Sequence, residues 1–262
     1  MKFLFYIIFL CLGFQVKAQF VNDSLSLNSA KAFNIDELNN IYIIQQDNSL
    51  VVYNLNGNII ATYQNIQDGD LSIVDARNPL KVLLYFPDFS KLIFLDRMMS
   101  IKSEISLNDF GFFNVNNVAL SSDGKIWLFD EDRQQLIKID ELGNFLYKSD
   151  DIRSLIRQHL NPIGIVESDG MVYIINKDSG VYVFDLYANY LNHIILDNYR
   201  TLQVYHDILL YAQGNDLKIY QLKDGVTKSI NFSSNQKFID AKIGKGYLFL
   251  LFENYLQLID LK

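Results

Sequence analysis

Oxygen-bearing side chains beside short apolar segments are the first candidates for chemistry in this sequence. Asp70, Asn117 and Asp240 each lie on or next to a segment that we expect to be the inner strand of a small sheet. Carboxylate and amide oxygens suit a hard cation, provided that several of them converge on one point. These three residues are therefore our candidates for an inward-facing binding site.

A second group of polar candidates lies in loops that follow aromatic segments. These loops cover residues 45–49, 130–135, 176–179 and 213–216. Loops on a rigid scaffold often carry function, so we add Asp132, Arg133 and Asp178 as binding candidates. An acidic, amide-rich face of this kind could bind a protein, a glycan or a cation, or could simply be solvated.

The sequence contains no recognisable catalytic motif. It lacks a Gly-x-Ser-x-Gly elbow, a His-Glu-x-x-His pair, a phosphate-binding loop and a dinucleotide motif. His206 with Asp207 could form an acid–base pair, but the two residues also fit a turn at the start of a strand. His159 and His193 are isolated, and we expect His193 to lie on the surface. We therefore assign no catalytic residue.

Composition limits the class of protein further. The chain has 262 residues, half of them hydrophobic, and a formal net charge of −7. The length allows one large all-β domain with a sizeable core. Three His and one Cys exclude a zinc module and a disulfide scaffold. The acidic balance argues against a nucleic-acid partner, which needs clustered Lys and Arg.

The first eighteen residues have the pattern of a secretory signal. Lys2 precedes an apolar run from Phe3 to Phe14, and Val16 and Ala18 occupy the positions that favour cleavage before Gln19. An uncleaved membrane anchor is the alternative, but the run is short against the ~20 residues needed to span a membrane. We expect an exported protein that is periplasmic, outer-membrane-associated or secreted, with no membrane span and no Cys after cleavage.

A repeat of about forty residues runs through the rest of the chain. Each unit contains an aromatic-rich strand, and a second apolar strand follows it after a short polar loop. The aromatic-rich strands are expected at 41–44, 82–86, 126–129, 172–175, 208–211 and 247–251, and the following strands at 50–53, 92–95, 136–139, 181–184, 217–220 and 256–259. An alternating outer strand and an inner strand complete most units, and Asp-Gly or Asn-Gly turns join them. Four antiparallel strands in each of six units predict an all-β, six-bladed β-propeller.

The predicted propeller occupies residues 19–262 as one domain. Its blades are expected at approximately 33–66, 69–110, 112–150, 161–198, 199–234 and 237–262. The last unit lacks an outer strand, so we expect residues 20–28 to complete it and close the ring. The segment 151–160 is compatible with a helical insert, with Ile152, Leu155, Ile156 and Leu160 on its packing face.

One blade carries a resemblance to known families. Residues 118–130, with Leu136–Asp140 and Leu142–Phe145, resemble a blade of the NHL-type and related TolB-like six-bladed propellers. The shared pattern is an Asp-Gly turn, an aromatic strand that ends in Asp, and a following apolar strand that ends in Asp before Gly. The resemblance implies the fold only, since propellers have many unrelated functions. Four of the apolar strands that follow the aromatic ones end in Asp, and these residues are expected to bind turn amides: Asp96, Asp140, Asp185 and Asp260.

Similarity to lactonase-like propellers implies one further possibility. Some of those proteins bind calcium through inward-pointing oxygens near the channel mouth, and calcium at Asp70, Asn117 and Asp240 is the corresponding prediction here. We expect an exported, non-catalytic binding or scaffolding protein of the cell envelope, present as a monomer. The alternatives are a metal-dependent lactonase-like hydrolase and an assembly factor for outer-membrane components.

Overall fold

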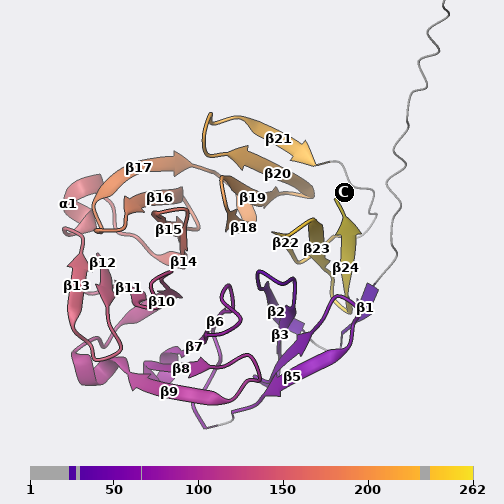
Figure 1. The fold of residues 1–262 in the computed structure, drawn as a ribbon. Coiled ribbons are helices and arrows are strands. Elements are labelled where there is room, and N and C mark those ends of the chain that lie inside the picture. The colour runs from indigo at the N-terminus through magenta and orange to yellow at the C-terminus, as the bar shows by residue number, and fades with distance from the viewer. Residues whose placement is uncertain (1–23, 28–29, 66, 231–236, 262) are drawn as a thin grey trace, which may run out of the picture.

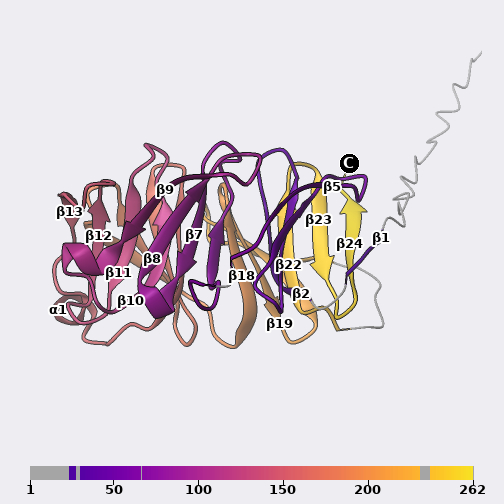
Figure 2. The same ribbon diagram turned by 90° about the horizontal axis from the view of Figure 1, so that it is seen from below.

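The chain folds into a ring of six small sheets around a central axis (Figure 1). The structure is a computed structural model that describes residues 24–27, 30–65, 67–230 and 237–261. Each sheet has four antiparallel strands, and viewed from the side the molecule is a flat disc (Figure 2). The prediction of an all-β, six-bladed propeller is confirmed. The predicted signal peptide, residues 1–18, lies outside the described residues.

Within each blade the chain runs from the axis outward through an inner, a second, a third and an outer strand. Blade 1 contains β2 (Ala30–Ile35), β3 (Ile41–Gln45), β4 (Leu50–Tyr53) and β5 (Ile59–Tyr63). Blade 2 contains β6 (Ile73–Asp75), β7 (Val82–Phe86), β8 (Lys91–Leu95) and β9 (Ile101–Ser106). Blade 3 contains β10 (Val115–Leu120), β11 (Ile126–Asp130), β12 (Gln135–Ile139) and β13 (Phe145–Lys148).

The remaining three blades follow the same order. Blade 4 contains β14 (Pro162–Ser168), β15 (Met171–Asn176), β16 (Gly180–Asp185) and β17 (Tyr190–Ile195). Blade 5 contains β18 (Tyr199–Tyr205), β19 (Ile208–Gln213), β20 (Asp216–Gln221) and β21 (Thr227–Ile230). Blade 6 contains β22 (Asp240–Gly244), β23 (Tyr247–Leu251) and β24 (Tyr255–Asp260), with β1 (Ser24–Ser26) as its outer strand.

The second strands are apolar on both faces because each blade is packed between two neighbours. In β7, Val82, Leu84 and Phe86 join the cluster shared with blade 1. Leu83 and Tyr85, which alternate with them, join the cluster shared with blade 3. Six such clusters each fill one interface between adjacent blades. A continuous apolar run is the pattern expected of a strand that is buried on both faces.

Side-chain hydrogen bonds fix the turns between third and outer strands. The Asp140 carboxylate accepts hydrogen bonds from the amides of Leu142 and Asn144, both at 2.9 Å. Asp96 and Asp185 bind their own turns in the same way. The prediction that these carboxylates hold turn amides is confirmed for all three residues.

The N-terminal strand lies beside the last blade. β1 pairs antiparallel with β24, with Ser24 opposite Gln257 and Ser26 opposite Tyr255. Leu27 then enters the cluster between blades 6 and 1, where it is 4% exposed. Of the segment expected to complete this blade, residues 20–23 and 28 lie outside the described residues.

The insert between blades 3 and 4 is shorter than its pattern predicts. Helix α1 (Ile152–Ile156) has a single turn, which Asp151 caps at its N-terminus and Arg157 ends in a left-handed conformation. Ile152 is buried against the blades, but Leu155 is 40% exposed. The expected packing face is therefore wrong at Leu155.

Two 3₁₀ turns, Pro87–Phe89 and Leu107–Phe110, are the other helical segments described. In the described ranges, no helix is long and apolar enough to cross a membrane.

Candidate functional site

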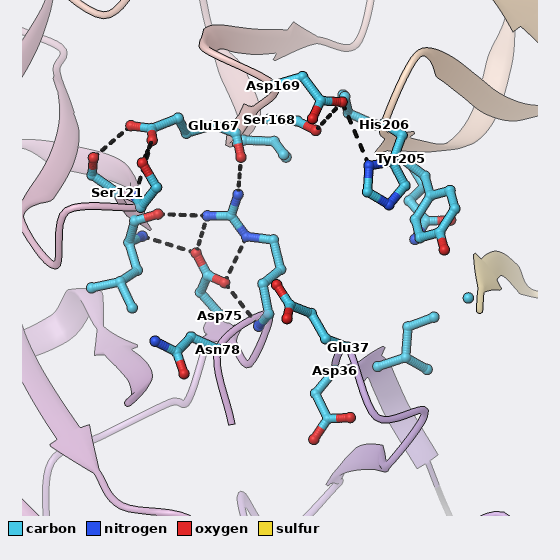
Figure 3. Close-up of a pocket in the computed structure, with 18 of the residues that line it drawn as sticks. Asp36, Glu37, Asp75, Asn78, Ser121, Glu167, Ser168, Asp169, Tyr205 and His206 are labelled. Carbon is cyan, nitrogen blue, oxygen red and sulfur yellow. Dashed lines mark hydrogen bonds and ion pairs between the residues drawn. The ribbon is translucent and has the colours of Figure 1, made fainter. Parts of the chain in front are cut away.

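The ends of all six inner strands surround one cavity on the axis of the ring (Figure 3). Its volume is about 730 Å³, within the ~300–1,000 Å³ common for small-ligand sites. The hairpin turns between inner and second strands line it, and we call this side of the ring the turn end. The lining consists of residues 35–37, 75, 77–78, 120–122, 166–169, 203–206 and 244–245. Every blade therefore contributes to the cavity wall.

Arg77 is the central group of that wall and joins three blades. Its Nε donates to Asp75 Oδ1 at 2.9 Å, and its Nη2 donates to Asp75 Oδ2 and to the backbone oxygen of Leu120 at 2.7 Å. Its Nη1 donates to the backbone oxygen of Glu167 in blade 4. Asp75 in turn accepts the amide of Leu120 at 2.8 Å. The guanidinium thus ties blades 2, 3 and 4 together at the cavity.

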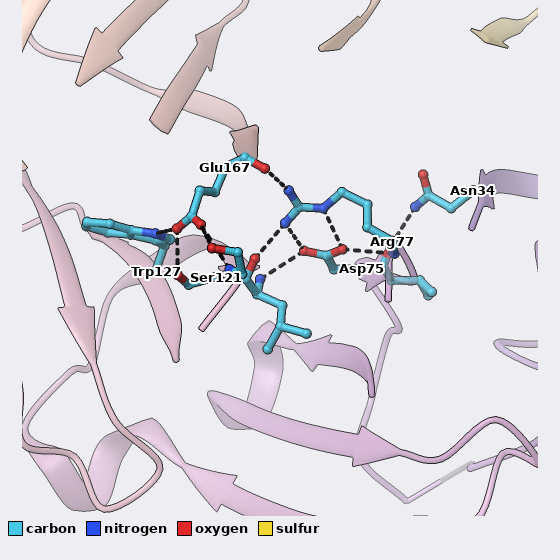
Figure 4. A network of polar contacts seen from close by, with 9 residues as sticks. Asn34, Asp75, Arg77, Ser121, Trp127 and Glu167 are labelled. Atoms are coloured by element: carbon cyan, nitrogen blue, oxygen red, sulfur yellow. Dashed lines mark hydrogen bonds and ion pairs between the residues drawn. The ribbon is translucent and has the colours of Figure 1, made fainter. Parts of the chain in front are cut away.

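Glu167 is the second buried acid of the wall, and four donors surround it (Figure 4). One carboxylate oxygen accepts the Ser121 hydroxyl and the indole N–H of Trp127, each at 2.5 Å. The other accepts the amide and the hydroxyl of Ser122. Because all four donors come from blade 3, the side chain joins blades 3 and 4.

These contacts keep both acids ionised despite their burial. Asp75 and Glu167 are each 8% exposed, and burial alone would raise the pKa of each carboxyl group. For Asp75, the charge and hydrogen bonds of Arg77 outweigh burial and lower the pKa. For Glu167, the bonds from Ser121, Ser122 and Trp127 outweigh burial and lower the pKa. Neither group is tuned to take up a proton near neutral pH.

Other blade boundaries are joined by amide side chains that bind backbone groups of the next blade. Asn34 donates to the backbone oxygen of Val74 at 2.5 Å. Gln203 both donates to the oxygen of Ile243 and accepts its amide. Asn39 makes the same pair of bonds to Lys245 at 2.9 and 3.0 Å. The ring around the cavity is therefore held by polar side chains as well as by the apolar clusters.

A smaller set of lining groups stays open to solvent at the cavity mouth. Asp169 and His206 lie across the boundary of blades 4 and 5 with their oxygen and Nδ1 3.5 Å apart, and their side chains are 60% and 66% exposed. Glu37 and Lys245 are also exposed, and neither side chain has a hydrogen-bond partner among the described residues. These groups, unlike the buried carboxylates of Asp75 and Glu167, are exposed to a ligand that enters the cavity mouth.

None of the residues singled out from the sequence as binding candidates lines this cavity. Asp240 begins an inner strand whose last residue, Gly244, does line it, so the two are about 13 Å apart along the strand. Asp240 lies near Lys242 (3.5 Å), and Asp70 accepts a hydrogen bond from Lys31 at 2.6 Å. Asn117 is buried and donates to the backbone oxygen of Pro162 at 2.6 Å. Each of the three thus has a partner in its own surroundings.

The candidates in the polar loops also lie away from the cavity. Their loops join second to third strands, on the side of the ring that we call the loop end, opposite the turn end. Asp132 accepts a hydrogen bond from Asn114 at 3.1 Å, and Arg133 pairs with Asp130. Asp178 is exposed in the loop after β15. Asp132 and Arg133 share a loop, and Asp178 belongs to the next blade.

No group of three or more His, Cys, Asp or Glu side chains in the described part of the chain is arranged to hold a metal ion. The calcium site expected at Asp70, Asn117 and Asp240 stays a prediction. His206, expected in a turn or in an acid–base pair with Asp207, lies in the turn between β18 and β19 with φ +49°. His193 is half-buried on β17, where its ring stacks on Tyr182.

Sequence reasoning missed Glu37, Asp75, Arg77, Glu167 and Asp169. All five lie where an inner strand ends or in the turn that follows it, which is the same part of each forty-residue repeat. Aligning the repeats on the ends of the inner strands, rather than on the aromatic strands, would have placed these residues in one group.

Comparisons with known proteins support the fold and nothing finer. No family model and no curated protein matches the chain. A streptogramin B lyase structure is 11% identical, with 93% of this chain and 98% of that chain covered and a TM-score of 0.62. Virginiamycin B lyase from Staphylococcus aureus is 12% identical, with 92% and 99% covered and a TM-score of 0.60. The Cps50 (Swd1) β-propeller domain of Myceliophteria thermophila is 7% identical, with 92% and 98% covered and a TM-score of 0.64. At these identities the chain shares a propeller fold with two lyases and with the Swd1 β-propeller domain alike.

Proposed function

We propose that this chain is an exported, non-catalytic binding or scaffolding protein of the cell envelope. The observation that carries the proposal is the saturation of the buried ionisable groups in the cavity wall. Both oxygens of Asp75 and both oxygens of Glu167 accept hydrogen bonds, and their lowered pKa values keep them charged. An acid that must exchange a proton with a substrate needs a free oxygen and a pKa near the working pH. These acids instead hold blades together.

The ring offers two surfaces on which a partner can dock. The turn end carries the cavity and its solvent-exposed rim, and the loop end carries the polar loops with Asp132, Arg133 and Asp178. Loops and turns on a rigid scaffold are common binding surfaces, and the closely packed blade interfaces supply the rigidity. Export rests on the sequence pattern of residues 1–18.

The test compares these two surfaces in one capture experiment. Mature chain 19–262 is crosslinked in envelope extract as wild type, as a loop-end variant (D132N/R133Q/D178N) and as a turn-end variant (E37Q/H206G). The outer-strand variant K228Q is the matched control. The proposal expects a protein that wild type and K228Q enrich to the same degree and that one surface variant loses. Equal capture by all four forms, or no enrichment over an unrelated propeller, would contradict it.

A metal-dependent hydrolase resembling lactonases is the second candidate. Among the described residues, the exposed Asp169–His206 pair at the cavity mouth favours it, since imidazole beside a carboxylate can act as a base. Thermal-shift titrations with calcium and with zinc separate the two functions. A rise of several degrees together with turnover of a lactone would favour the hydrolase. Unchanged melting temperature and no turnover would favour the binding protein.

A further inference from the structure

The exposed rim of the cavity combines hydrogen-bond donors and acceptors from separate blades (Figure 3). Blade 1 contributes Glu37, blade 4 contributes Asp169, blade 5 contributes His206 and blade 6 contributes Lys245, while Asn78 of blade 2 adds an amide. The residues that line this rim thus include two carboxylates, one lysine, one imidazole and one amide. Such a rim presents neither the uniform positive charge that an anion requires nor the uniform negative charge that a polycation requires.

His206 occupies its position at a conformational cost. Tyr205 pairs with Ile208, so His206 and Asp207 alone form the hairpin loop. His206 has φ +49°, a region that glycine adopts freely and a residue with a β-carbon does not. Its side chain is 66% exposed and touches the Tyr205 ring edge-on, with centroids 4.6 Å apart. Burial therefore offsets little of the cost. A two-residue hairpin loop requires a positive φ, and here the residue that adopts it presents an exposed imidazole at the cavity mouth.

We infer that the cavity mouth binds a short neutral oligosaccharide, with His206 and Glu37 as hydrogen-bonding groups and the Tyr205 ring as an apolar contact. A sugar hydroxyl both donates and accepts, so a ligand rich in hydroxyls can use carboxylate, imidazole and ammonium groups together. An uncharged ligand suits a rim with both charge signs, and the cavity volume of about 730 Å³ suits a small ligand. The inference rests on the proposed binding function and names a ligand class for its turn end.

The experiment measures binding and stability in the same set of variants. Isothermal titration calorimetry with maltotriose, cellotriose and N,N′,N″-triacetylchitotriose gives affinity, and calorimetric scanning gives the melting temperature. The variants are H206G, E37Q and R157G. Arg157 is the matched control, because it is exposed, has φ +57° and ends helix α1 away from the cavity.

We expect wild type to bind at least one of the three sugars with a Kd below about 1 mM, a value common for weak small-ligand sites. H206G should lose about tenfold or more in affinity while its melting temperature rises by about 2–4 °C, because glycine relieves the left-handed strain. R157G should gain similar stability and keep wild-type affinity. E37Q should bind more weakly with an unchanged melting temperature.

Three results would overturn the inference, the first two concerning the neutral sugars and the third the charged comparators. The first is the absence of heat with all three sugars, and the second is wild-type affinity in both H206G and E37Q. Trigalacturonic acid and chitotriose, as acidic and basic comparators, must bind more weakly than the best neutral sugar, and tighter binding of either would also overturn it. If the sugars fail while envelope extract still yields a partner that a surface variant loses, the oligosaccharide is wrong and the scaffolding function stands.

Discussion

At the scale of single residues, the cavity wall depends on acids that are used as hydrogen-bond acceptors. Glu167 accepts four hydrogen bonds from one neighbouring blade, and one of them comes from Trp127, the only tryptophan in the chain. Trp127 is fully buried, so its fluorescence reports directly on this boundary. The carboxylate is charged and almost inaccessible to water, which makes it expensive to alter.

Replacing Glu167 by Gln tests this role. The amide has the shape of the carboxylate, but an NH₂ donor takes the place of one acceptor oxygen. This NH₂ group faces the hydrogen-bond donors of blade 3 and leaves at least one of them unpaired. We expect E167Q to lower the free energy of unfolding by about 2–4 kcal/mol, measured by urea unfolding with Trp127 fluorescence. The control is E141Q, which removes a surface ion pair with Lys81 and should cost less than about 1 kcal/mol. Equal losses in the two variants would refute the role.

Acid should weaken the protein through the same carboxylates. The pKa values of Asp75 and Glu167 are lowered in the folded state, so the unfolded chain binds protons first as the pH falls. Their stabilisation is complete at about pH 5 and above, and it is lost as the pH falls through the ordinary carboxyl pKa of about 4 toward the lower folded values. Urea midpoints between pH 7 and pH 3 should show this fall. The decrease should be shallower in E167Q, and a parallel decrease would exclude Glu167 as a contributor.

At the scale of elements, the sequence predicts strands well because their pattern is local. The second strands are apolar on both faces and are followed by short loops, so their positions follow from the pattern of residues along the chain. The end of helix α1 could not be predicted in this way. Arg157 ends the helix with φ +57°, and a non-glycine residue gives no sequence signal for that conformation. Blade 1 likewise begins at Ala30, earlier than the expected 33, because Ala30 and Lys31 look like linker residues.

The short helix contains two apolar residues, three positions apart, whose burial differs. Ile152 is 1% exposed in the cluster between blades 3 and 4, whereas Leu155 is 40% exposed. We expect I152A to lower the free energy of unfolding by about 2–4 kcal/mol, since it leaves a cavity. L155A should change it by less than about 0.5 kcal/mol. Urea unfolding of the two variants checks this, and a larger loss in L155A would favour the full-length helix of the sequence-based prediction.

At the scale of the whole molecule, the ring explains why the fold was predictable and the cavity was not. Blade count and order follow from a repeat that can be read along the chain. The cavity wall depends on partners about forty or more residues apart, such as Arg77 with Leu120 and Glu167. Those pairings exist only once the repeats are bent into a circle. Each of the residues also has an ordinary local environment in the sequence, at the end of a strand.

The contact between the two ends of the chain should matter to the entire ring. Without β1, the outer edge of β24 would expose unpaired backbone groups, and the cluster between blades 6 and 1 would lose Leu27. In a ring, a defect at one boundary weakens both adjoining blades, so unfolding should stay cooperative and shift as a whole.

We expect L27A to lower the melting temperature by about 4–12 °C, which corresponds to about 2–3 kcal/mol for a chain of this size. Removal of residues 20–28 should lower it further. The control is L261A near the other end, where the side chain is 45% exposed, and its melting temperature should change by less than about 2 °C. If removal of 20–28 has no larger effect than L261A, blade 6 is stable with three strands and the N-terminal strand does not close the ring.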